Sequence, residues 1–568
     1  MLARYNGDAI VREKHEVLGV TETDVELSSV ICVSIGRGRH KQVIAEHRHL
    51  VEQGARLVEM RLDYIRRNVT LKRLLKDRPS PVVMTCRRQQ DGGKWEGTEE
   101  NRIILLRAAI VAGADYIDLE EDIADQVPRY GATKRIISLH DFDETPQDLA
   151  AIHERLTAKD ADIVKIACLA NCPNDVTRML QLLESVQSQA SKLYEATTVL
   201  KAHLGRQPTE QELADHMQIP LRDMEKLIAT SSIPTIGICM GDIGASSRIL
   251  AGKFGSPFTY GTFHHERQLA PGQLSFQQMT DTYRYESIDT DTEVYGVIAD
   301  PVGHSMSPII HNAAFAAMGM NRVYVPLRVP SDYLEQFIRE APELGIRGLS
   351  VTIPHKENVM AMLTKIESGA RKIGAVNTVV FDGDDVIGYN TDLYAAMLSL
   401  AEAVDEDADS KWMDGKRVLI LGAGGVARAI AMGVVDRGAK LQITSRTYER
   451  AMGLASEMKC EAIEWEERHQ ASPDVLINCT PVGMHPEVNE TPFEESGISR
   501  RMIVFDTIYN PEQTLLLKTA RENGCKTVSG VEMFVKQAEL QFKFFTDKEA
   551  PSDVMRDTLR KTIGAAKY

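Results

Sequence analysis

The sequence predicts an α/β protein in two halves: an N-terminal (β/α)8 barrel with a helical insertion, then two smaller α/β parts. Three observations support this prediction. The 568-residue chain is too long for one ordinary hydrophobic core. Short apolar runs alternate with helical stretches from Ser29 to about Tyr285. Further along, a strand, a glycine turn and the start of a helix follow one another directly in residues 417–429.

The composition is that of a globular protein without a basic surface. Hydrophobic residues make up 43% of the chain, and the formal net charge is −15. This charge disfavours non-specific binding of nucleic acids and anionic membranes, because both need a positive surface. Anionic small molecules would need local clusters of Arg and Lys. We expect neither a signal peptide at Met1 nor a membrane span, since the most apolar stretch, residues 418–435, is interrupted by Gly and Arg.

The cysteines indicate a reducing compartment. There are eight of them, and most lie in apolar runs, as Cys32 and Cys239 do. Buried, reduced thiols in a cytoplasmic protein are the expectation. Cys168 and Cys172 lack a matching second pair, so no metal site is expected.

Eight candidate strands span roughly 250 residues, as a (β/α)8 barrel requires. They are Val30–Ser34, Leu57–Met60, Val82–Cys86, Tyr116–Leu119, Arg135–Leu139, Ile163–Cys168, Thr235–Met240 and Pro257–Tyr260. In this fold the catalytic residues gather at the carboxyl ends of the strands. Polar residues stand at five of these ends: Glu59 and Arg61, Arg87, Glu120, His140 and Lys165. One such residue alone could be a cap or a surface charge, but together they favour an active site.

Lys165 and His140 are the candidate catalytic pair of this half. Lys165 lies within an apolar strand, where an ammonium costs several kcal/mol unless it is paired or loses its proton. A neutral amine can attack a ketone to form a Schiff base. An imine makes the neighbouring carbon acidic enough for an imidazole near neutral pH. The alternative is a lysine whose head reaches solvent beside a structural histidine.

Six motifs follow one another along this half. They are Glu59-Met-Arg61-Leu-Asp63, Thr85-Cys-Arg87, Ser138-Leu-His140-Asp-Phe142, Lys165-Ile-Ala, Met240-Gly-Asp-Ile-Gly-Ala-Ser-Ser-Arg248 and Ala270-Pro-Gly-Gln273. Together they resemble type I 3-dehydroquinate dehydratase. The resemblance implies that Lys165 forms an imine with the C3 ketone and that His140 shuttles protons. It further implies that the substrate's carboxylate and hydroxyls are held by Glu59, Arg61, Arg87, Arg248 and Gln273. Two departures are Leu269, where many relatives carry a small hydroxyl residue, and Asp91, where some carry Glu.

The connection between Lys165 and Met240 is longer than is usual in that family. The excess lies roughly between Gln187 and Ala229 and predicts helices separated at Gly205-Arg-Gln-Pro208 and Pro220. One segment, residues 204–217, is similar to a helix-turn-helix of bacterial sigma factors. Residues 191–230 hold five Lys/Arg and six Asp/Glu, whereas a DNA-binding helix normally has a basic face. A packed helical lid or a dimer contact is therefore favoured over DNA binding.

The second half begins after an acidic run, Asp289-Thr-Asp-Thr-Glu293, which predicts a linker. Polar motifs then alternate with strands and helices. They are Gly303-His-Ser305-Met-Ser307-Pro308, Leu349-Ser-Val-Thr352-Ile-Pro-His-Lys356, Gly374-Ala-Val-Asn377-Thr378 and Gly388-Tyr-Asn390-Thr-Asp392. Hydroxyls, amides, a lysine and an aspartate suit a polyhydroxylated ligand. The alternative is turn and cap chemistry, which Ser-Pro and Asn-Thr-Asp also serve.

The glycine turn predicts a dinucleotide site in a Rossmann-type domain. The pyrophosphate would meet the helix N-terminus formed by Gly422, Ala423, Gly424, Gly425, Val426 and Ala427. The next strand ends in Ser445-Arg446-Thr447, with Arg450 close behind. NAD enzymes usually carry an acid at this position, so the arginines favour NADP.

Three more motifs complete the pattern of this half. They are Asn478-Cys-Thr480-Pro-Val-Gly483-Met484, Asp506-Thr-Ile-Tyr509-Asn-Pro511 and Gly530-Val-Glu-Met533-Phe-Val-Lys-Gln537. The half resembles shikimate dehydrogenase over its whole length. This implies that Lys356 and Asp392 are the catalytic pair and that Thr480, Met484 and Gly530 help to bind NADP. The implied shikimate ligands are Ser305, Ser307, Thr352, Asn377, Tyr509 and Gln537. Ser350 stands where some relatives have Asn.

The two resemblances predict one bifunctional, cytoplasmic enzyme: the dehydratase product, 3-dehydroshikimate, is the dehydrogenase substrate. We expect three parts: an N-terminal extension at 1–28, the barrel at 29–287 with its insert at about 187–229, and the dehydrogenase at 288–568. Within the dehydrogenase, the substrate part comprises about 293–395 and the helices at about 533–568. The NADP part comprises about 396–532. A regulator without chemistry is disfavoured by the retained Lys165, His140, Lys356 and Asp392. A catabolic, NAD-linked enzyme for quinate is disfavoured by Arg446. The role of the insert, a homo-oligomeric state and direct transfer between the sites stay open.

Overall fold

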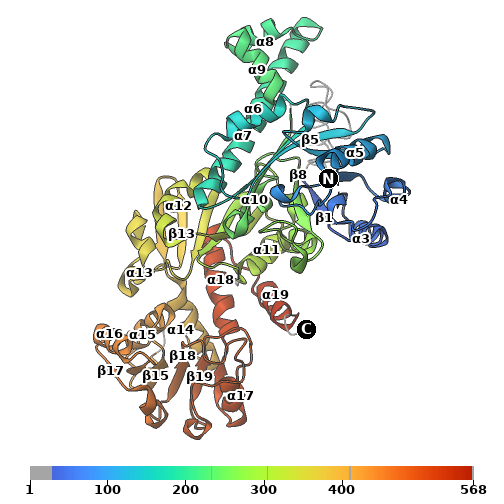
Figure 1. The fold of residues 1–568 in the computed structure, drawn as a ribbon. Helices are drawn as coiled ribbons and strands as arrows, with labels where there is room; N and C mark the ends of the chain where they lie inside the picture. The colour runs from blue at the N-terminus through green and yellow to red at the C-terminus, as the bar shows by residue number, and fades with distance from the viewer. Residues whose placement is uncertain (1–28, 232, 304, 408–410, 566–568) are drawn as a thin grey trace. The chain divides into compact units, whose positions relative to one another are not determined.

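The computed structural model describes residues 29–231, 233–303, 305–407 and 411–565 (Figure 1). The expected N-terminal extension, 1–28, therefore lies outside the described residues. Internal contacts divide the chain into two compact units. The first runs to Glu293 and includes Val325–Leu344, and the second combines Val294–Tyr324 with the chain from Gly345 onward.

The first unit is built on eight parallel strands in the order β7-β6-β5-β4-β3-β2-β1-β8. Their bounds are β1 Val30–Ile35, β2 Leu57–Arg61, β3 Val82–Thr85, β4 Tyr116–Glu120, β5 Lys134–Asp141, β6 Ile163–Leu169, β7 Thr235–Met240 and β8 Phe258–Thr262. The barrel and all eight predicted strands are confirmed, with ends that shift by no more than two residues. The strands are rich in Val and Ile because a parallel sheet is buried on both faces.

Helices connect the strands and cover them from outside. They are α3 His40–Glu52, α4 Leu71–Leu75, α5 Glu99–Val111, α6 Leu149–Thr157, α7 Pro173–Leu204 and α10 Gly241–Leu250. Side chains cap two of them: the Thr98 hydroxyl accepts from the Asn101 amide at the start of α5, and Asp148 accepts from Ala151 at the start of α6. The strand ends are thereby held in fixed positions for the site.

The strand register brings polar side chains to one level of the barrel. Glu120 of β4 pairs with Ser138 of β5, which pairs with Lys165 of β6. Residues that pair in parallel strands point to the same side of the sheet, and so does Asp118, two residues before Glu120. The interior below this level is apolar, with Val30, Leu57, Ile136 and Phe258 in its core. The polar level is therefore the top of a packed barrel.

The insert forms a small helical unit at the end of α7. Here α7 continues for 32 residues and is followed by α8 Glu210–Met217 and α9 Leu221–Ser231. The predicted capping box is present, since Thr209 and Glu212 bond each other's backbone amides. A core of its own holds the insert together, formed by Leu193, Ala196, Leu213, Ala214 and Met224.

The insert lies away from the predicted catalytic face. Helix α7 starts where β6 ends, and 32 residues of helix extend about 48 Å, well past the far end of a seven-residue strand. Figure 1 shows α8 and α9 at the distal end of α7. Their attachment there includes an ion pair of 2.6 Å between Lys226 and Glu154 of α6. The expectation of a lid over the barrel mouth is therefore wrong, because α7 carries the insert toward the amino ends of the strands.

The expected linker is only partly exposed. Ile288 and Thr292 are buried, whereas Asp289, Thr290 and Asp291 are exposed. The Lys253 ammonium donates to the Thr290 carbonyl at 2.9 Å, and the Ser29 hydroxyl donates to the Ile288 carbonyl at 3.2 Å. The segment thus runs along the barrel before β9 begins.

The second half contains two sheets of six strands each. The first has the order β10-β9-β11-β13-β14-β12 and the second β17-β16-β15-β18-β19-β20. The first comprises β9 Glu293–Ala299, β10 Arg322–Arg328, β11 Ile346–Val351, β12 Lys365–Ile366, β13 Thr378–Asp382 and β14 Asp385–Tyr389. The second is wholly parallel and comprises β15 Arg417–Leu421, β16 Lys440–Thr444, β17 Glu461–Ala462, β18 Val475–Asn478, β19 Ile503–Asp506 and β20 Lys526–Val528.

Helices cover these sheets and connect them. They are α11 Ser307–Ala317, α12 Leu334–Glu340, α13 Ser368–Ile373, α14 Thr391–Ala403, α15 Gly425–Val435, α16 Tyr448–Met458, α17 Leu515–Glu522, α18 Gly530–Thr546 and α19 Ser552–Ala565. Two of them, α14 and α18, lie against each other where the chain passes from one sheet to the other and back. Among the residues that the structure describes, no helix is both long and apolar enough to cross a membrane.

Replacing residues 190–229 by a Gly/Ser linker should leave dehydration of 3-dehydroquinate intact, because the insert has its own core at the opposite end of α7. The measurement is steady-state turnover of the purified variant. Leu213→Asp, which disrupts only the core of the insert, is the matched control and should behave alike. Loss of turnover in both variants, with the barrel still folded by circular dichroism, would show that the insert supports the active site.

Candidate active sites

All seven residues predicted for the barrel site line one cavity of roughly 50 Å³. They are Glu59, Arg61, Arg87, His140, Lys165, Arg248 and Gln273. The cavity lies where the polar level of the barrel meets the loops after the strands. The loop residues Gly92, Phe142 and Leu269 close it from above. Its volume is about that of one or two water molecules.

Lys165 is held between a carboxylate and an aromatic ring. Its side chain is 6% exposed, and its Nζ lies 3.0 Å from Asp118 Oδ2. On another side, Nζ lies 4.1 Å from the centre of the Tyr260 ring, within the range of a cation–π contact. Neither partner was predicted from the sequence. An aspartate inside the otherwise apolar run of β4 was the signal for Asp118.

Asp118 is the anion on which the surrounding cations converge. Its Oδ1 accepts from Ser138 Oγ at 2.6 Å and lies 2.8 Å from Arg87 Nη2. Burial alone would raise the pKa of Asp118, but Arg87 and Lys165 hold it well below the ordinary value. The carboxylate therefore stays ionised and keeps Lys165 in place.

A second carboxylate extends this network. Glu120 bonds Arg87 Nη1 at 2.9 Å through one oxygen and Arg102 Nη1 at 2.8 Å through the other. Arg102 is completely buried and also contacts Glu99 at 2.6 Å. Positive and negative side chains thus alternate from Lys165 of β6 to Arg102 of α5, with Asp118, Arg87 and Glu120 between them. Glu120 supports Arg87 from behind and is not among the residues that line the cavity.

Arg248 differs from the other two arginines of the cavity. Arg61 forms two hydrogen bonds with Asp63, at 2.9 and 2.8 Å, and Arg87 binds Asp118 and Glu120. Arg248 is 2% exposed, yet within the described residues it has no carboxylate partner, and its Nε has no hydrogen bond. Burial lowers its pKa to about 10. A buried guanidinium without a counter-ion is ready for the carboxylate of a ligand.

His140 is placed to accept a proton. Its ring stacks on Phe142 with 6.4 Å between centroids, and its Nδ1 has no hydrogen-bond partner among the described atoms. Burial lowers the pKa of His140 well below its ordinary value, and the positive charges of Arg87 and Lys165 lower it further. The imidazole is therefore neutral near pH 7 and can act as a base.

Two further predicted residues are already bonded to the protein. Glu59 accepts from Ser34 Oγ at 2.7 Å and from Thr85 Oγ1 at 2.8 Å. Gln273 uses its side-chain oxygen to accept from the Leu269 amide at 2.8 Å. Gln273 therefore fixes the loop that closes the cavity, and only its amide nitrogen is left to reach a substrate.

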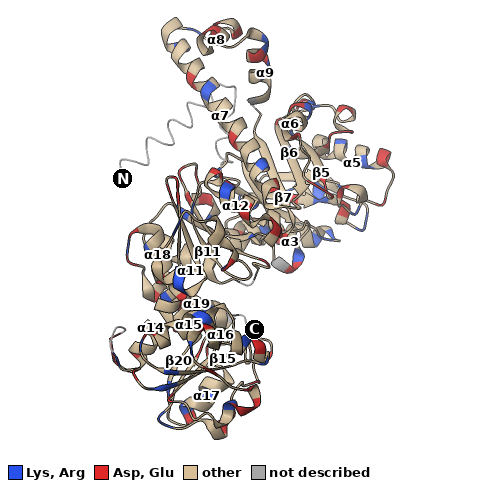
Figure 2. Cartoon of the chain, turned by 90° about the vertical axis from the view of Figure 1, so that its left-hand side faces the viewer, with Lys and Arg blue, Asp and Glu red and all other residues tan. Residues whose placement is uncertain are grey.

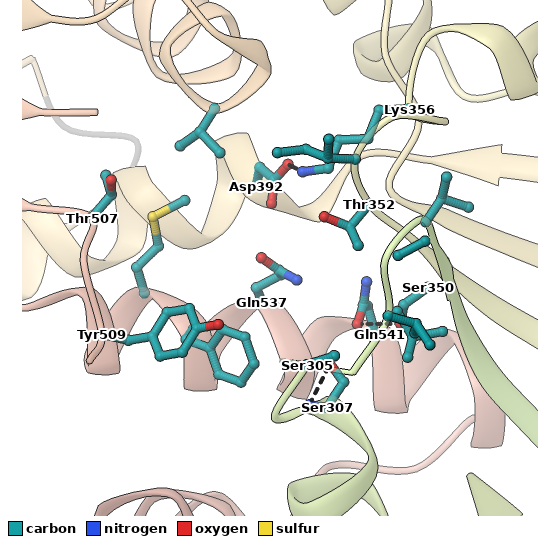
Figure 3. A pocket seen from close by; sticks show the side chains of 18 of the residues that line it. Ser305, Ser307, Ser350, Thr352, Lys356, Asp392, Thr507, Tyr509, Gln537 and Gln541 are labelled. Carbon is teal, nitrogen blue, oxygen red and sulfur yellow. Dashed lines mark hydrogen bonds and ion pairs between the residues drawn. The ribbon is translucent and has the colours of Figure 1, made fainter. Parts of the chain in front are cut away.

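The second half holds a larger cavity of roughly 430 Å³. Its walls include seven predicted residues: Ser305, Ser307, Thr352, Lys356, Asp392, Tyr509 and Gln537. Lys356 Nζ lies 2.6 Å from Asp392 Oδ2. Figure 3 shows this pair at one side of the cavity, with Gln537 pointing from α18 into the space before it. A charged lysine thus faces an open, hydroxyl-lined pocket.

Asn377 differs from the expectation, since it does not line this cavity. It is buried one layer back, where its amide donates to Thr391 Oγ1 at 3.0 Å and accepts from the Thr391 backbone at 2.9 Å. Its place on the wall is taken by Ser350 and Gln541. Ser350 Oγ accepts from the Tyr324 hydroxyl at 2.6 Å and donates to Gln541 Oε1 at 2.8 Å. The departure at Ser350 is thus part of a buried network.

The glycine turn between β15 and α15 fits a pyrophosphate. Gly422 has φ +106°, and a Cβ there would lie 2.8 Å from the Cys479 carbonyl oxygen, so only glycine fits. Gly424 caps α15, whose amino end is free to face an anion. Val426 of this helix lines the large cavity, so nucleotide and substrate sites adjoin.

The other predicted cofactor residues surround this turn. Arg446, Thr447 and Arg450 follow β16 and are exposed, and neither arginine forms an ion pair with a described residue. Thr480 is held by a 2.7 Å hydrogen bond to Asn478, and Met484 is exposed. Gly530 begins α18 and packs so closely on the Ile508 carbonyl that a Cβ would lie 2.3 Å from its oxygen. Two unpaired arginines beside a pyrophosphate turn suit an additional phosphate.

Family models match both halves. The type I 3-dehydroquinase model matches residues 31–200 and 217–290. Models for the shikimate dehydrogenase substrate binding domain, the shikimate/quinate 5-dehydrogenase and the shikimate 5'-dehydrogenase C-terminal domain match 297–379, 406–513 and 530–560. A model of sigma-70 region 3 matches 188–235, which is the insert.

Curated relatives cover the same regions. The chain is 35% identical over 560 residues to the chloroplastic bifunctional 3-dehydroquinate dehydratase/shikimate dehydrogenase of Arabidopsis thaliana, covering 94% of this chain and 85% of the relative. NADP(+) shikimate dehydrogenases from Caldanaerobacter subterraneus and Methanopyrus kandleri are 40% and 42% identical. Each covers 48% of this chain, over 98% and 97% of its own length.

Asp506→Asn should stabilise the dehydrogenase half at alkaline pH. Burial raises the pKa of Asp506 from 3.8 to about 6, although hydrogen bonds from Thr514, Ile508 and Asn478 lower it. The folded state therefore binds this proton more tightly than the unfolded state. The contribution of the bound proton to the free energy of unfolding is fully present below pH 3.8 and is lost as the pH rises through about 6. The gain in melting temperature on substitution should be larger at pH 8 than at pH 5.

Asp384→Asn is the control, because Asp384 is exposed and should show no such pH dependence. Calorimetry of both variants at the two pH values measures the difference. An equal effect of Asp506→Asn at both values would contradict the assigned shift.

Proposed function

The chain belongs to the family of bifunctional 3-dehydroquinate dehydratase/shikimate dehydrogenases, and we propose that its two cavities perform the two reactions with the residues described above. The barrel dehydrates 3-dehydroquinate to 3-dehydroshikimate, and the second half reduces this product to shikimate with NADPH. One observation in each half carries the residue assignment: a buried lysine beside a neutral histidine in the barrel, and a lysine–aspartate pair beside a nucleotide turn in the second half.

Lys165 carries the covalent step of the dehydratase. The Lys165 ammonium first passes one proton to His140, and the free amine then attacks the C3 carbonyl carbon. The carbonyl oxygen takes this proton back from His140 and a second one from the nitrogen and leaves as water, so that a protonated imine remains. Asp118 and the Tyr260 ring lie beside this nitrogen and stabilise its positive charge. His140 removes a proton from the carbon next to the imine and returns it to the leaving hydroxyl, which departs as water. Hydrolysis of the imine then frees Lys165.

The substrate's charge is met by Arg248. This guanidinium is the one in the barrel cavity whose counter-ion is missing within the described chain, and a carboxylate would satisfy its donors in a bidentate way. Arg61, Arg87, Glu59 and Gln273 then face the ring hydroxyls.

The dehydrogenase uses Lys356 as a proton donor. NADPH, when bound, supplies a hydride to the ketone carbon. Negative charge then develops on the ketone oxygen, where the Lys356 ammonium stabilises it and donates a proton. Asp392, at 2.6 Å, orients the lysine toward the ketone oxygen. Ser305, Ser307, Thr352, Tyr509 and Gln537 orient the substrate, and Asn377 supports them through Thr391.

Arg446 and Arg450 bind the 2′-phosphate and thus select NADP. They stand at the end of β16, where an acid would instead bind the ribose hydroxyls. Gly422 lets the backbone approach the pyrophosphate, which Ala423 and Gly425 help to bind, while the buried Ala427 packs behind them. Ser445 and Thr447 bind the adenosine side. Gly530 lines the substrate cavity and Thr480 lies against Gly422, and with Met484 they complete the coenzyme site.

The division into parts at 29–287 and 288–568, with the NADP part at about 396–532, stays our proposal. We place the enzyme in the cytoplasm, which agrees with eight free cysteines. The plant relative is named chloroplastic. A homo-oligomer stays a prediction from the sequence, which light scattering of the purified protein would measure.

DNA binding by the insert is not favoured, in spite of its match to sigma-70 region 3. Figure 2 shows acidic and basic residues mixed over α8 and α9. Five basic against six acidic residues in 191–230 leave no excess of positive charge for a phosphate backbone.

Single substitutions should separate the two activities. Lys165→Ala should abolish NADPH oxidation with 3-dehydroquinate but not with 3-dehydroshikimate, whereas Lys356→Ala should abolish both and let 3-dehydroshikimate accumulate. NADPH absorbance measures the first result and chromatography of the product measures the second.

Borohydride with 3-dehydroquinate should label the peptide that contains Lys165. His140→Ala should lower dehydratase turnover about 10²–10⁴-fold. An active Lys165→Ala barrel would refute the imine mechanism.

Arg446→Asp should weaken the preference for NADPH. The change replaces a cation for the 2′-phosphate by an acid that repels it, so the NADPH Michaelis constant should rise while that for NADH falls or stays. The measurement is kcat/KM for both coenzymes with 3-dehydroshikimate. Arg428→Asp, in α15 and paired with Glu457, is the control. An unchanged coenzyme ratio would assign the selectivity to other residues.

A further inference from the structure

A second hollow adjoins the dehydratase cavity, and the reaction described above does not use it. It measures roughly 220 Å³ and shares the wall residues Ser34 and Leu269 with the inner cavity. Its remaining wall includes three cationic side chains, Arg37, Lys94 and Arg267. They come from the loops after β1, β3 and β8, on the same face of the barrel as the catalytic residues.

The charges of this hollow are not balanced. Glu46 is its one acid, and it pairs with Arg37 and lies 3.8 Å from Arg267 Nη1. Lys94 Nζ stands 4.5 Å from the centre of the Tyr64 ring and, among the described residues, forms no ion pair. Three cations thus share one carboxylate. In a chain with a net charge of −15, this is a local positive field at the mouth of the site.

Leu269 separates the hollow from the inner cavity. Its Cδ2 packs on the backbone of Gly36, where a Cβ would lie only 2.8 Å away. The loop of Leu269 is held in this position by hydrogen bonds from its amides to Gln273. The inner cavity offers roughly 50 Å³ and the outer hollow roughly 220 Å³, so the outer hollow is the roomier of the two. A substrate that reaches the inner cavity by way of the outer hollow passes Leu269, which lines both.

We propose that the hollow lined by Arg37, Lys94 and Arg267 is an outer binding site for a small hydroxylated carboxylate, the dehydratase substrate, before it passes Leu269. The inference rests on the proposed function of the barrel. Lys94 and Arg267 attract and hold the carboxylate, and Arg248 takes it over inside. A local positive field raises the association rate of an anion about 10- to 10³-fold, and salt screens the effect. The site thus acts on capture and leaves the chemical step unchanged.

The test compares the double variant Lys94→Gln/Arg267→Gln with the full-length parent enzyme and with Arg129→Gln. Both changed residues are exposed, so the fold should tolerate them. Arg129 loses the same charge but pairs with Asp160 and Asp162 at the opposite end of the barrel. At low ionic strength, kcat/KM for 3-dehydroquinate should fall about 10-fold in the double variant, with kcat within twofold of the parent. Its dependence on salt should flatten, and Arg129→Gln should match the parent.

Two results would overturn the proposal: a kcat that falls together with kcat/KM, or a salt dependence equal to that of the parent. Inorganic phosphate, as a competing anion, distinguishes a carboxylate site from a general anion site. Inhibition of the parent at millimolar phosphate, absent in the double variant, would contradict selectivity for the carboxylate. Borohydride labelling of Lys165 at saturating substrate is the separate check on the barrel chemistry. If the parent enzyme is not labelled, the proposed function fails and not the outer site.

Discussion

The buried pair of Lys165 and Asp118 is the constraint on which the barrel depends. Removing an ammonium and a carboxylate from water costs several kcal/mol for each, and the pair regains this only when every remaining donor and acceptor is also satisfied. Ser138 and Arg87 satisfy Asp118, and Glu120 satisfies Arg87 in turn. Loss of one member would leave the next charge unpaired at a cost of about 3–5 kcal/mol. Lys165 is thus held by a network in which each charge is compensated by the next.

Positive charge without an acidic partner marks where the ligands' charges go. The barrel interior satisfies Arg61 and Arg87 with carboxylates but leaves Arg248 without one. The second half pairs Lys356 with Asp392 but leaves Arg446 and Arg450 exposed beside the nucleotide turn. The chain carries an excess of acidic residues, so an acid could have been placed beside each of these arginines. Its absence among the described contacts is better explained by an anionic ligand than by chance.

The sequence was sufficient for the strands and for most of the wall residues, because both are local patterns. Apolar runs with a polar residue at their end predicted that Glu59, Arg87, His140 and Lys165 gather at the carboxyl ends of the barrel strands. Partners across strands could not be predicted, since Asp118 reaches Lys165 only through the register of three strands, and Tyr260 through closure of the barrel by β8. Asn377 was placed on the wall by resemblance, but its amide is used to hold Thr391. The direction in which the insert extends depends on the length of α7, and no sequence motif predicts that length.

A lysine lies in each of the two cavities, but its surroundings differ. Lys165 faces about 50 Å³ of space, where a carboxylate and an aromatic ring stabilise a positive nitrogen. Lys356 faces about 430 Å³ that adjoin a nucleotide turn, where a coenzyme must enter and leave in every cycle. A covalent intermediate needs the first environment, and an exchangeable hydride donor needs the second. The charged and aromatic neighbours of Lys165 and the nucleotide turn beside the cavity of Lys356 therefore suit different steps.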